Sequence, residues 1–411
     1  MKKKLLYFLL FMFATFMNSC KKGASFEYEL PEDSNVKTIA MEPLTGYEKL
    51  RYSDVYSKVE YIQLETNDES LVSEVSKLEV LDDGKLIVFD KKIGAIVLFD
   101  EKGKYINRIG RKGNGHGEYA YPIDIAYDKY HNRVIVYDSA KAEMLIFDMD
   151  GKYISSIGIK WFASAFSIID KKHFCLFLNH YGVSSSTPCT DNAVIIDHSG
   201  NIVTQDLKYD KDLENFHPET SNTFTADESD IYLKPPFSSI VYDINPKAIE
   251  AAYYIDFGKD EIPREWISGN DWTLIDKIRQ SSNVTFLRSF FKTKNGFVLN
   301  VTKGGKEGLC FIGLKGEKQA KAAFSMSNDM YGLQSNILMK AVHNNKCYIC
   351  LEPSAFNTDK ELLQLEGIKL YTIDEKGDPI QYIPSQKDKD LVFSINETDN
   401  PIIQICTLKE L

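Results

Sequence analysis

The sequence predicts an all-β fold, a six-bladed β-propeller closed by N- and C-terminal strands in the last blade. The first observation is an internal repeat, because residues 84–110 align with residues 132–158 without a gap at an offset of 48 residues. The second is that both copies consist of short runs of β-branched and aromatic residues separated by glycine and aspartate turns. A repeat of this size is typical of a propeller blade, a four-stranded sheet that needs a neighbour on each face.

Each strong copy contains two strands and a hairpin turn. The runs "KLIVFD" and "AIVLFD" supply strands, and "DEKGKY" and "DMDGKY" place a glycine after an acidic stretch, as a hairpin turn requires. Because Asp90, Asp100, Asp138 and Asp148 recur with the repeat, we assign them to turns rather than to one active site. Fainter copies bring the count to six blades and lie at 193–207, 239–258, 290–318 and 337–352.

The third observation is that two strand-like runs, 59–65 and 402–411, have no partner within the repeats. A closed propeller leaves no open edge, so we expect these two runs to share the last blade. Residues 353–400 would then be an insertion in that blade, with a helical stretch at "PSAFNTDKELLQLEG". A seventh blade built from "GIKLYTIDEKGDPIQYIP" is the alternative. The propeller is expected over 58–411, with a helical excursion between blades at about 259–284.

The glycine-rich stretch "GRKGNGHGEYAYP" at 110–122 connects two blades. A phosphate-binding loop would need GxxxxGK[ST] or GxGxxG opening a helix, and the stretch contains neither. The glycines instead allow the backbone to reverse at positive φ, and Pro122 fixes the approach to the next strand. The connector resembles the turn of NHL-type propeller repeats.

The first 19 residues have the pattern of a signal peptide, with three lysines before an apolar run that is too short to cross a membrane. The ending Met17-Asn18-Ser19-Cys20 resembles a bacterial lipobox, which implies acylation of Cys20 and a membrane anchor. A simple cleaved signal is the alternative. We expect residues 20–57 to be the lipidated cysteine and a tether. No acidic cluster follows Cys20, which favours the periplasmic face of the outer membrane over the cell surface.

Charge and cysteine content exclude some classes of function. Without residues 1–19 the chain has 46 basic and 59 acidic side chains, a formal charge of −13, so nucleic acid is a poor partner. The remaining cysteines are too widely spaced for a small disulfide scaffold. Cys347 and Cys350 have redox-motif spacing but would face opposite sides of a strand. The six are Cys175, Cys189, Cys310, Cys347, Cys350 and Cys406.

Several side chains are candidates for a site. His116 and Glu118 in the connector could hold a metal or act as an acid and base, or could belong to a solvated turn in which Glu118 accepts backbone amides. Some charged residues early in inner strands could line the axial channel and grip a polar ligand, or form interior ion pairs. Two tryptophans could stack on a glycan or pin the excursion to the propeller. The channel candidates are Asp124, Arg288 and Lys340, and the aromatic candidates are Trp266 and Trp272.

The order of several segments resembles that of six-bladed β-propeller lipoproteins of gut-type Gram-negative bacteria. They are the lipobox, "VEYIQLETNDESLVSEVSKLEV", "RIGRKGNGHGEYAYPIDIAYD", "YYIDFG" and "NPIIQICTLK". The resemblance implies the fold and carries over no catalytic motif, and neither GxSxG nor HExxH occurs. We therefore expect a non-catalytic envelope module that binds a partner protein, peptide or glycan at one end of the channel. The alternative is a lyase or hydrolase with a site shared between blades. We expect no cofactor, a divalent metal being the alternative, and the oligomeric state stays open.

Overall fold

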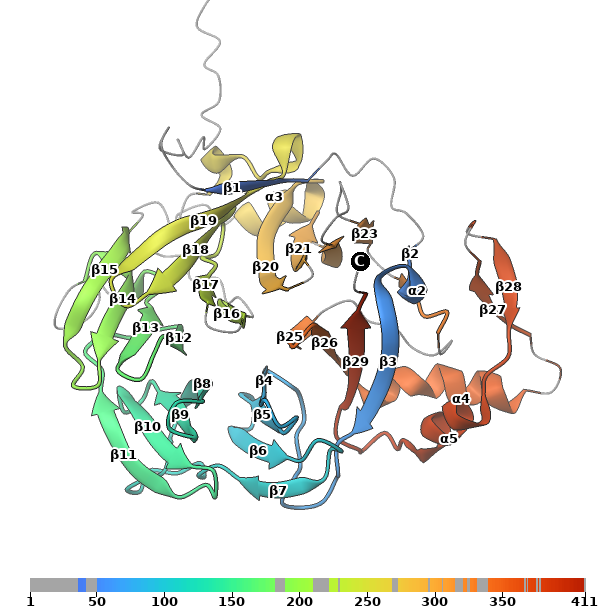
Figure 1. The fold of residues 1–411 in the computed structure, drawn as a ribbon, viewed down its shortest axis with the longest axis horizontal. Helices are drawn as coiled ribbons and strands as arrows, with labels where there is room; N and C mark the ends of the chain where they lie inside the picture. The colour runs from blue at the N-terminus through green and yellow to red at the C-terminus, as the bar shows by residue number, and fades with distance from the viewer. Residues whose placement is uncertain are drawn as a thin grey trace, which may run out of the picture.

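The protein is a ring of six radial sheets around a central axis, as the computed structural model shows (Figure 1). The innermost strands of the six sheets lie nearest the axis, and the strand order of each sheet runs outward from them to the rim. The six-bladed all-β prediction is confirmed. The structure describes residues 36–41, 50–181, 189–209, 222–227, 230–267, 273–294, 296–304, 306–314, 321–323, 326–330, 339–365, 367, 369–374, 376 and 378–409.

The blades follow one another in chain order, and the strands of each blade lie in the following order from the axis outward. Blade one is β4 (Lys77–Val80), β5 (Leu86–Asp90), β6 (Ala95–Phe99) and β7 (Tyr105–Arg108); blade two is β8 (Pro122–Asp128), β9 (Arg133–Asp138), β10 (Glu143–Asp148) and β11 (Tyr153–Gly158). Blade three is β12 (Ala165–Ile168), β13 (His173–Phe177), β14 (Asp191–Asp197) and β15 (Ile202–Lys208); blade four is β16 (Phe224–Asp227), β17 (Asp230–Leu233), β18 (Ile240–Asn245) and β19 (Ala248–Asp256). Blade five is β20 (Val284–Thr293), β21 (Gly296–Lys303), β22 (Lys306–Leu314) and β23 (Lys321–Ala323); blade six is β25 (Met339–His343), β26 (Lys346–Leu351), β29 (Ile402–Leu408) and β3 (Tyr56–Gln63).

Blade six joins the two ends of the chain, as the sequence predicts. The C-terminal strand β29 pairs antiparallel with β26 on one side and with the N-terminal β3 on the other. Its pairing with β3 runs from Ile402 opposite Gln63 to Leu408 opposite Tyr56. The seven-bladed alternative is wrong, because β27 (Leu370–Ile373) and β28 (Pro379–Tyr382) form a separate two-stranded sheet outside the ring.

Part of the expected tether is built into the propeller. Within 20–57, β1 (Lys37–Ala40) pairs in parallel with the rim strand β19 and makes blade four five-stranded. An unpaired rim strand exposes a row of backbone donors and acceptors, and β1 covers that row. Nearer the propeller, β2 (Leu50–Arg51) pairs with β24 (Met326–Ser327), and α2 (Tyr52–Val55) leads into β3.

The apolar strands are explained by packing on both faces of each blade. In β5, Leu86 and Val88 lie in the core shared with blade six, whereas Ile87 and Phe89 lie in the core shared with blade two. All four side chains are almost completely buried. A strand between two blades therefore needs no polar face, which is why "LIVFD" shows no alternation.

The recurring aspartates have structural roles, as their recurrence predicts. Asp148 Oδ1 accepts hydrogen bonds from the Asp150 and Lys152 amides in the turn after β10, and Asp100 does the same in blade one. Asp90 and Asp138 are fully buried at the ends of β5 and β9. Their carboxylates accept amides of the connector that enters their own blade, as in the 2.7 Å bond from Ser73 N to Asp90.

Short helices lie outside the sheets. The range 259–284 contains most of η3 (Gly258–Asp260), together with η4 (Arg264–Trp266) and α3 (Leu274–Gln280). Between β26 and β29 lie η5 (Pro353–Phe356), α4 (Asn357–Gln364), the β27–β28 hairpin and α5 (Gln386–Ser394). Among the described residues, no helix is long and apolar enough to cross a membrane.

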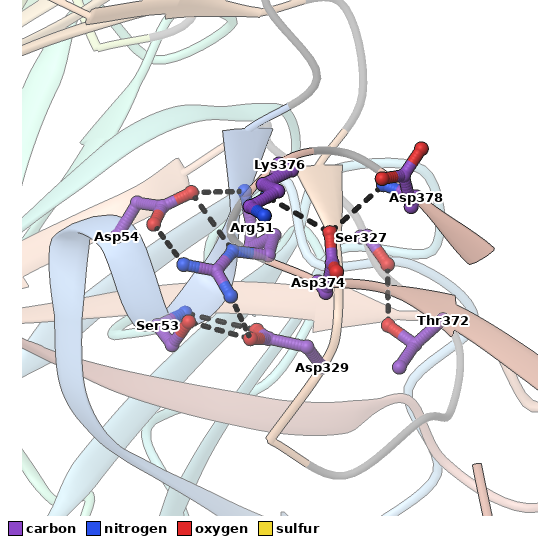
Figure 2. Close-up of polar contacts among 9 residues, drawn as sticks. All are labelled: Arg51, Ser53, Asp54, Ser327, Asp329, Thr372, Asp374, Lys376 and Asp378. Carbon is purple, nitrogen blue, oxygen red and sulfur yellow. Dashed lines mark hydrogen bonds and ion pairs between the residues drawn. The ribbon is translucent and has the colours of Figure 1, made fainter. Parts of the chain in front are cut away.

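Polar contacts join the hairpin and the N-terminal segment to the segment around β24, which follows blade five (Figure 2). Asp329, which follows β24, accepts bonds from the backbone and side chain of Ser53 and lies 3.8 Å from the Arg51 guanidinium. Two residues earlier, the Ser327 hydroxyl is 2.9 Å from the hydroxyl of Thr372 in β27. Three segments that are distant in sequence are thus held together beside the ring.

Candidate functional site

A cavity of 380 Å³ opens at the end of the axis where the inner strands begin. We call it the axial mouth. Its wall contains the first residues of β4, β8, β12 and β16 and residues that follow β5 and β13. Its charged and polar lining includes Glu74, Lys77, Lys91, Asp124, Thr223 and Arg288.

A second cavity of 830 Å³ lies along the inner strands and reaches their far ends. Lys77, Asn222 and Phe224 line both cavities, so the two are parts of one axial channel. Inner strands of all six blades contribute residues to this channel, although no local motif in the sequence marks them. Such a convergence of blades is the usual setting for a ligand in a propeller.

Asp124 is a buried structural centre of the axial mouth. One oxygen accepts the Lys77 ammonium at 2.8 Å, and the other accepts the Phe166 amide at 3.0 Å. These contacts join blades one, two and three. Burial alone would lower the pKa of Lys77, but the attraction of Asp124 and Glu79 outweighs it and the pKa is raised. Asp124 thus lines the cavity and also forms an interior ion pair, so it has features of both of the alternatives that the sequence left open.

Arg288 lines the mouth from blade five, and Lys234 is buried near it without lining the cavity. Arg288 lines the cavity from β20, and its Nε donates to the Thr302 hydroxyl at 3.0 Å. Lys234 follows β17, and its backbone amide donates to the carbonyl of Thr223, a residue of the cavity wall. The side chain of Lys234 is 2% exposed, and its Nζ has no hydrogen-bond partner among the described residues. Burial, with the charge of Arg288 as a second cause, lowers the pKa of Lys234 to about 7.

The other predicted channel residue, Lys340, lies in β25 and lines the larger cavity rather than the axial mouth. The structure therefore brings Asp124 and Arg288 together at one cavity and places Lys340 apart from them. Sequence reasoning missed Lys234. Its signal in the chain is a lysine directly after the apolar run "IYL" in a strand of a repeat.

His116 and Glu118 lie in the connector and line neither part of the channel. Glu118 accepts the Gly115 amide at 2.8 Å and the Arg111 guanidinium at 2.6 Å, and these two bonds lower its pKa. The His116 ring packs edge-on against Tyr153 at 4.9 Å. Within the described ranges no group of three or more His, Cys, Asp or Glu side chains could hold a metal. The geometry matches the turn alternative for this pair.

The remaining predicted residues lie away from the axial mouth or outside the described part of the chain. Trp266 is half-buried in η4 on the excursion. Trp272 and Cys20 lie outside the described residues. Cys347 and Cys350 face the cores on opposite sides of blade six, as the strand spacing predicts, and burial raises the pKa of the Cys350 thiol to about 12.

Comparison with known families places the chain among proteins of the same architecture. The model of the domain of unknown function DUF4934 matches residues 36–407. The chain belongs to this family. No functionally curated protein matches it.

A solved structure shares the fold of this DUF4934 protein, and others match it more weakly. An exported protein of Bacteroides fragilis superposes with a TM-score of 0.71 at 15% identity, covering 91% of this chain and 100% of its own. A DUF4221 protein of Bacteroides vulgatus reaches a TM-score of 0.43 at 12% identity, over 86% and 97% of the two chains. Virginiamycin B lyase of Staphylococcus aureus reaches 0.40 at 9% identity, over 85% and 99%. The first match supports the propeller fold, and the two weaker ones add nothing about function.

Proposed function

We propose that this DUF4934 protein is a non-catalytic binding propeller of the cell envelope that recognises a carboxylate on a partner protein, peptide or glycan at the axial mouth. The observation that carries the proposal is the buried Nζ of Lys234, which lies near Arg288. This Nζ has no hydrogen-bond partner among the described residues. A buried cation without an anion is unfavourable, and a bound carboxylate would relieve it. Lys77 is already paired with Asp124, so among these residues Lys234 is the buried cation that a bound carboxylate would help.

The rest of the protein is acidic, which restricts such a ligand. Long-range repulsion disfavours a polyanion, whereas a single carboxylate experiences less repulsion and can be attracted by the positive charge at the mouth. A peptide C-terminus or one uronic acid residue of a glycan has this chemistry. The polar wall and the open mouth suit a chain end that enters from outside.

The test compares matched ligands that differ in one carboxylate. Trialanine and its C-terminal amide, and the monosaccharides galacturonate and galactose, are titrated by calorimetry into the mature protein. The acid forms should bind at least about 10-fold tighter than the neutral forms. Arg288→Gln should remove that preference, and Arg279→Gln, at an exposed arginine of α3, should keep it. Equal binding of acid and neutral forms would overturn the proposal.

The competing hypothesis is a lyase or hydrolase, and Lys234 gives it a specific basis. An amine with a pKa of about 7 is suited to proton transfer at neutral pH. Lys234 does not line the axial mouth and its Nζ is buried, which disfavours direct proton transfer to a ligand there, whereas its charge can still attract a carboxylate bound beside Arg288. Shortening of a galacturonate oligomer or peptide by wild type, lost in Lys234→Met, would indicate an enzyme.

We also propose that Cys20 is acylated and anchors the protein to the outer membrane, facing the periplasm. The lipobox-like sequence and the likeness to an exported protein support this location. Membrane fractionation of cells expressing wild type and Cys20→Ser tests it. The wild type should sediment with the outer membrane and resist protease added to intact cells. Release of both forms into the soluble fraction would show a simple cleaved signal.

A further inference from the structure

A separate cavity of 330 Å³ lies between blades three and four. We call it the interblade cavity. Its wall comes from the end of β13, a residue of β14, the end of β15, the loop and strand 235–242, and the segment from β19 into the excursion. Most of this wall is apolar or aromatic. The side chains that define it are Phe177, Phe237, Tyr242, Tyr254, Ile262 and Ile267.

The volume and lining fit a small ligand. Ligand pockets in proteins range from about 300 to 1,000 Å³ and are predominantly apolar, with a few polar groups that fix orientation. The interblade cavity is at the small end of this range, so a ligand with one or two rings would fill it. Its polar groups form two sets: Glu261 hydrogen-bonds Ser239, and His180 pairs with Asn192 on the side of blade three, with the exposed Asp206 and Lys208 at the rim.

Glu261 is a half-buried carboxylate whose donors are hydroxyl groups. Its side chain accepts the Ser239 hydroxyl at 2.5 Å and the Tyr254 hydroxyl at 3.5 Å. Burial raises the pKa of Glu261, and the nearby Asp256 raises it further. Among the described residues no lysine, arginine or histidine forms an ion pair with it. Hydrogen bonds from two hydroxyls orient the carboxylate but leave its charge uncompensated in an apolar setting.

The backbone of this wall is strained at three positions. His180, Leu207 and Phe237 have φ values of 68°, 63° and 55°, in the left-handed region that non-glycine residues rarely occupy. All three line the interblade cavity. Leucine and phenylalanine there have no local side-chain hydrogen bond to favour the conformation, so the fold maintains the strain at an energetic cost. Clustering of such positions around one cavity is typical of a ligand site.

The interblade cavity is distinct from the axial mouth. Asn179 and Tyr181 line the mouth, whereas His180 between them lines the interblade cavity, so this short segment forms a wall between the two. Glu261 and its partner Ser239 line the interblade cavity and do not line the mouth. Binding at one cavity can therefore be measured without occupying the other.

We propose that the interblade cavity binds a small aromatic or cyclic amine, with its ammonium paired to Glu261 and its ring packed among Phe237, Tyr242 and Tyr254. The ammonium would supply a positive charge beside Glu261 and would donate to the carboxylate in a charge-assisted hydrogen bond. Aromatic faces around the pair add attraction for the cation. An anionic ligand of the same shape would meet Glu261 and be repelled.

The test uses tryptamine and indole-3-acetate, which share a ring and differ in the sign of their charge. Both are titrated by saturation-transfer NMR and calorimetry into the full protein near neutral pH. Tryptamine should bind with a Kd of about 1 mM or tighter, and indole-3-acetate at least about 10-fold more weakly. Glu261→Gln should weaken tryptamine at least about 10-fold. Glu250→Gln, at an exposed glutamate of β19 in the same blade, is the matched control and should leave it unchanged.

A second variant keeps the test decisive if Glu261→Gln does not fold. Phe237→Gly removes an aromatic wall at a backbone conformation that glycine adopts without strain, so it should fold and weaken tryptamine. Arg288→Gln, at the axial mouth, should not affect tryptamine. Absence of saturable tryptamine binding, equal binding of indole-3-acetate, or retention of affinity in a folded Glu261→Gln or Phe237→Gly protein would each overturn the proposal.

Discussion

Replacement of Lys234 by methionine should stabilise the protein, and by an amount that depends on pH. The lysine is 2% exposed and its pKa is lowered from 10.5 to about 7. Methionine keeps an unbranched apolar stem of similar length and removes the buried charge. Replacing an isolated buried ion by an apolar side chain is generally stabilising.

The magnitude follows from the shift in pKa. A pKa lowered in the folded state means that folding opposes protonation, and this penalty is fully present below pH 7. Between pH 7 and 10.5 the unfolded chain binds more protons than the folded one, so the penalty declines as pH rises. It amounts to roughly 5 kcal/mol at pH 6 and roughly 2 kcal/mol at pH 9. The stability gap between Lys234→Met and wild type should therefore shrink by about 3 kcal/mol over this range.

Urea denaturation at pH 6 and pH 9, followed by tryptophan fluorescence, measures this gap. Lys247→Met provides the control, because Lys247 is an exposed lysine in the β18–β19 turn of the same blade. Its gap to wild type should be small and similar at both pH values. The reasoning is refuted if the Lys234→Met gap stays constant between the two pH values, or if the variant is less stable than wild type at pH 6.

Two further substitutions test how the blades are held. Gly151→Ala should lower the free energy of unfolding by about 2–4 kcal/mol, because φ is +80° and a Cβ there would overlap the backbone oxygen of Arg108. Gly158→Ala is the control, because a Cβ there meets nothing within 4 Å, and it should change the free energy of unfolding by less than about 1 kcal/mol. Equal effects of the two alanines in urea denaturation would contradict this account. Asp124→Asn should cost about 2–4 kcal/mol, because it removes the nearer of the two carboxylates that pair with the Lys77 ammonium, the other being Glu79 at 3.5 Å. The double variant with Lys77→Met should recover much of that loss. A double variant no more stable than Asp124→Asn would show that the ion pair is not the cause.

The fold was accessible from the sequence because blade packing leaves a periodic trace. Two copies at one offset identify the blade, and the unpaired runs near Val59 and Ile402 identify the closure, which the β3–β29 pairing confirms. The strand β1 could not be foreseen in the same way. Its residues "KTIA" have no long apolar run, and what stabilises them is the open edge of β19, which is more than two hundred residues away in the sequence.

The site was only partly accessible, for a similar reason. Asp124 and Arg288 could be placed because early positions of inner strands face the axis in any propeller. Burial of Lys234 depends on the adjacent blade, and the interblade cavity is assembled from several segments of two blades and the excursion, between residues 177 and 267. Strand periodicity fixes which residues share a face, but it does not state which space that face encloses.

The repeat itself nevertheless marks Lys234 once the strand register is known. In blade one, Lys77 pairs with Phe89 and Asp90 follows; in blade four, Phe224 pairs with Leu233 and Lys234 follows. Lys234 therefore occupies the position of the buried aspartate.

This exchange changes what the position can do. In blades one and two the carboxylate accepts amides of the connector that enters the blade. An ammonium group cannot accept hydrogen bonds, so Lys234 cannot bind connector amides as the aspartate does. Blade four instead keeps a buried cation beside Arg288. Natural proteins keep a local departure from such a repeat, at a cost in stability, mainly where a function requires the departure. If the carboxylate-binding proposal is correct, the gain in stability of Lys234→Met and its loss of carboxylate preference should occur together. A variant that gained stability and bound carboxylates unchanged would instead identify Lys234 as a defect of the fold without a role in binding.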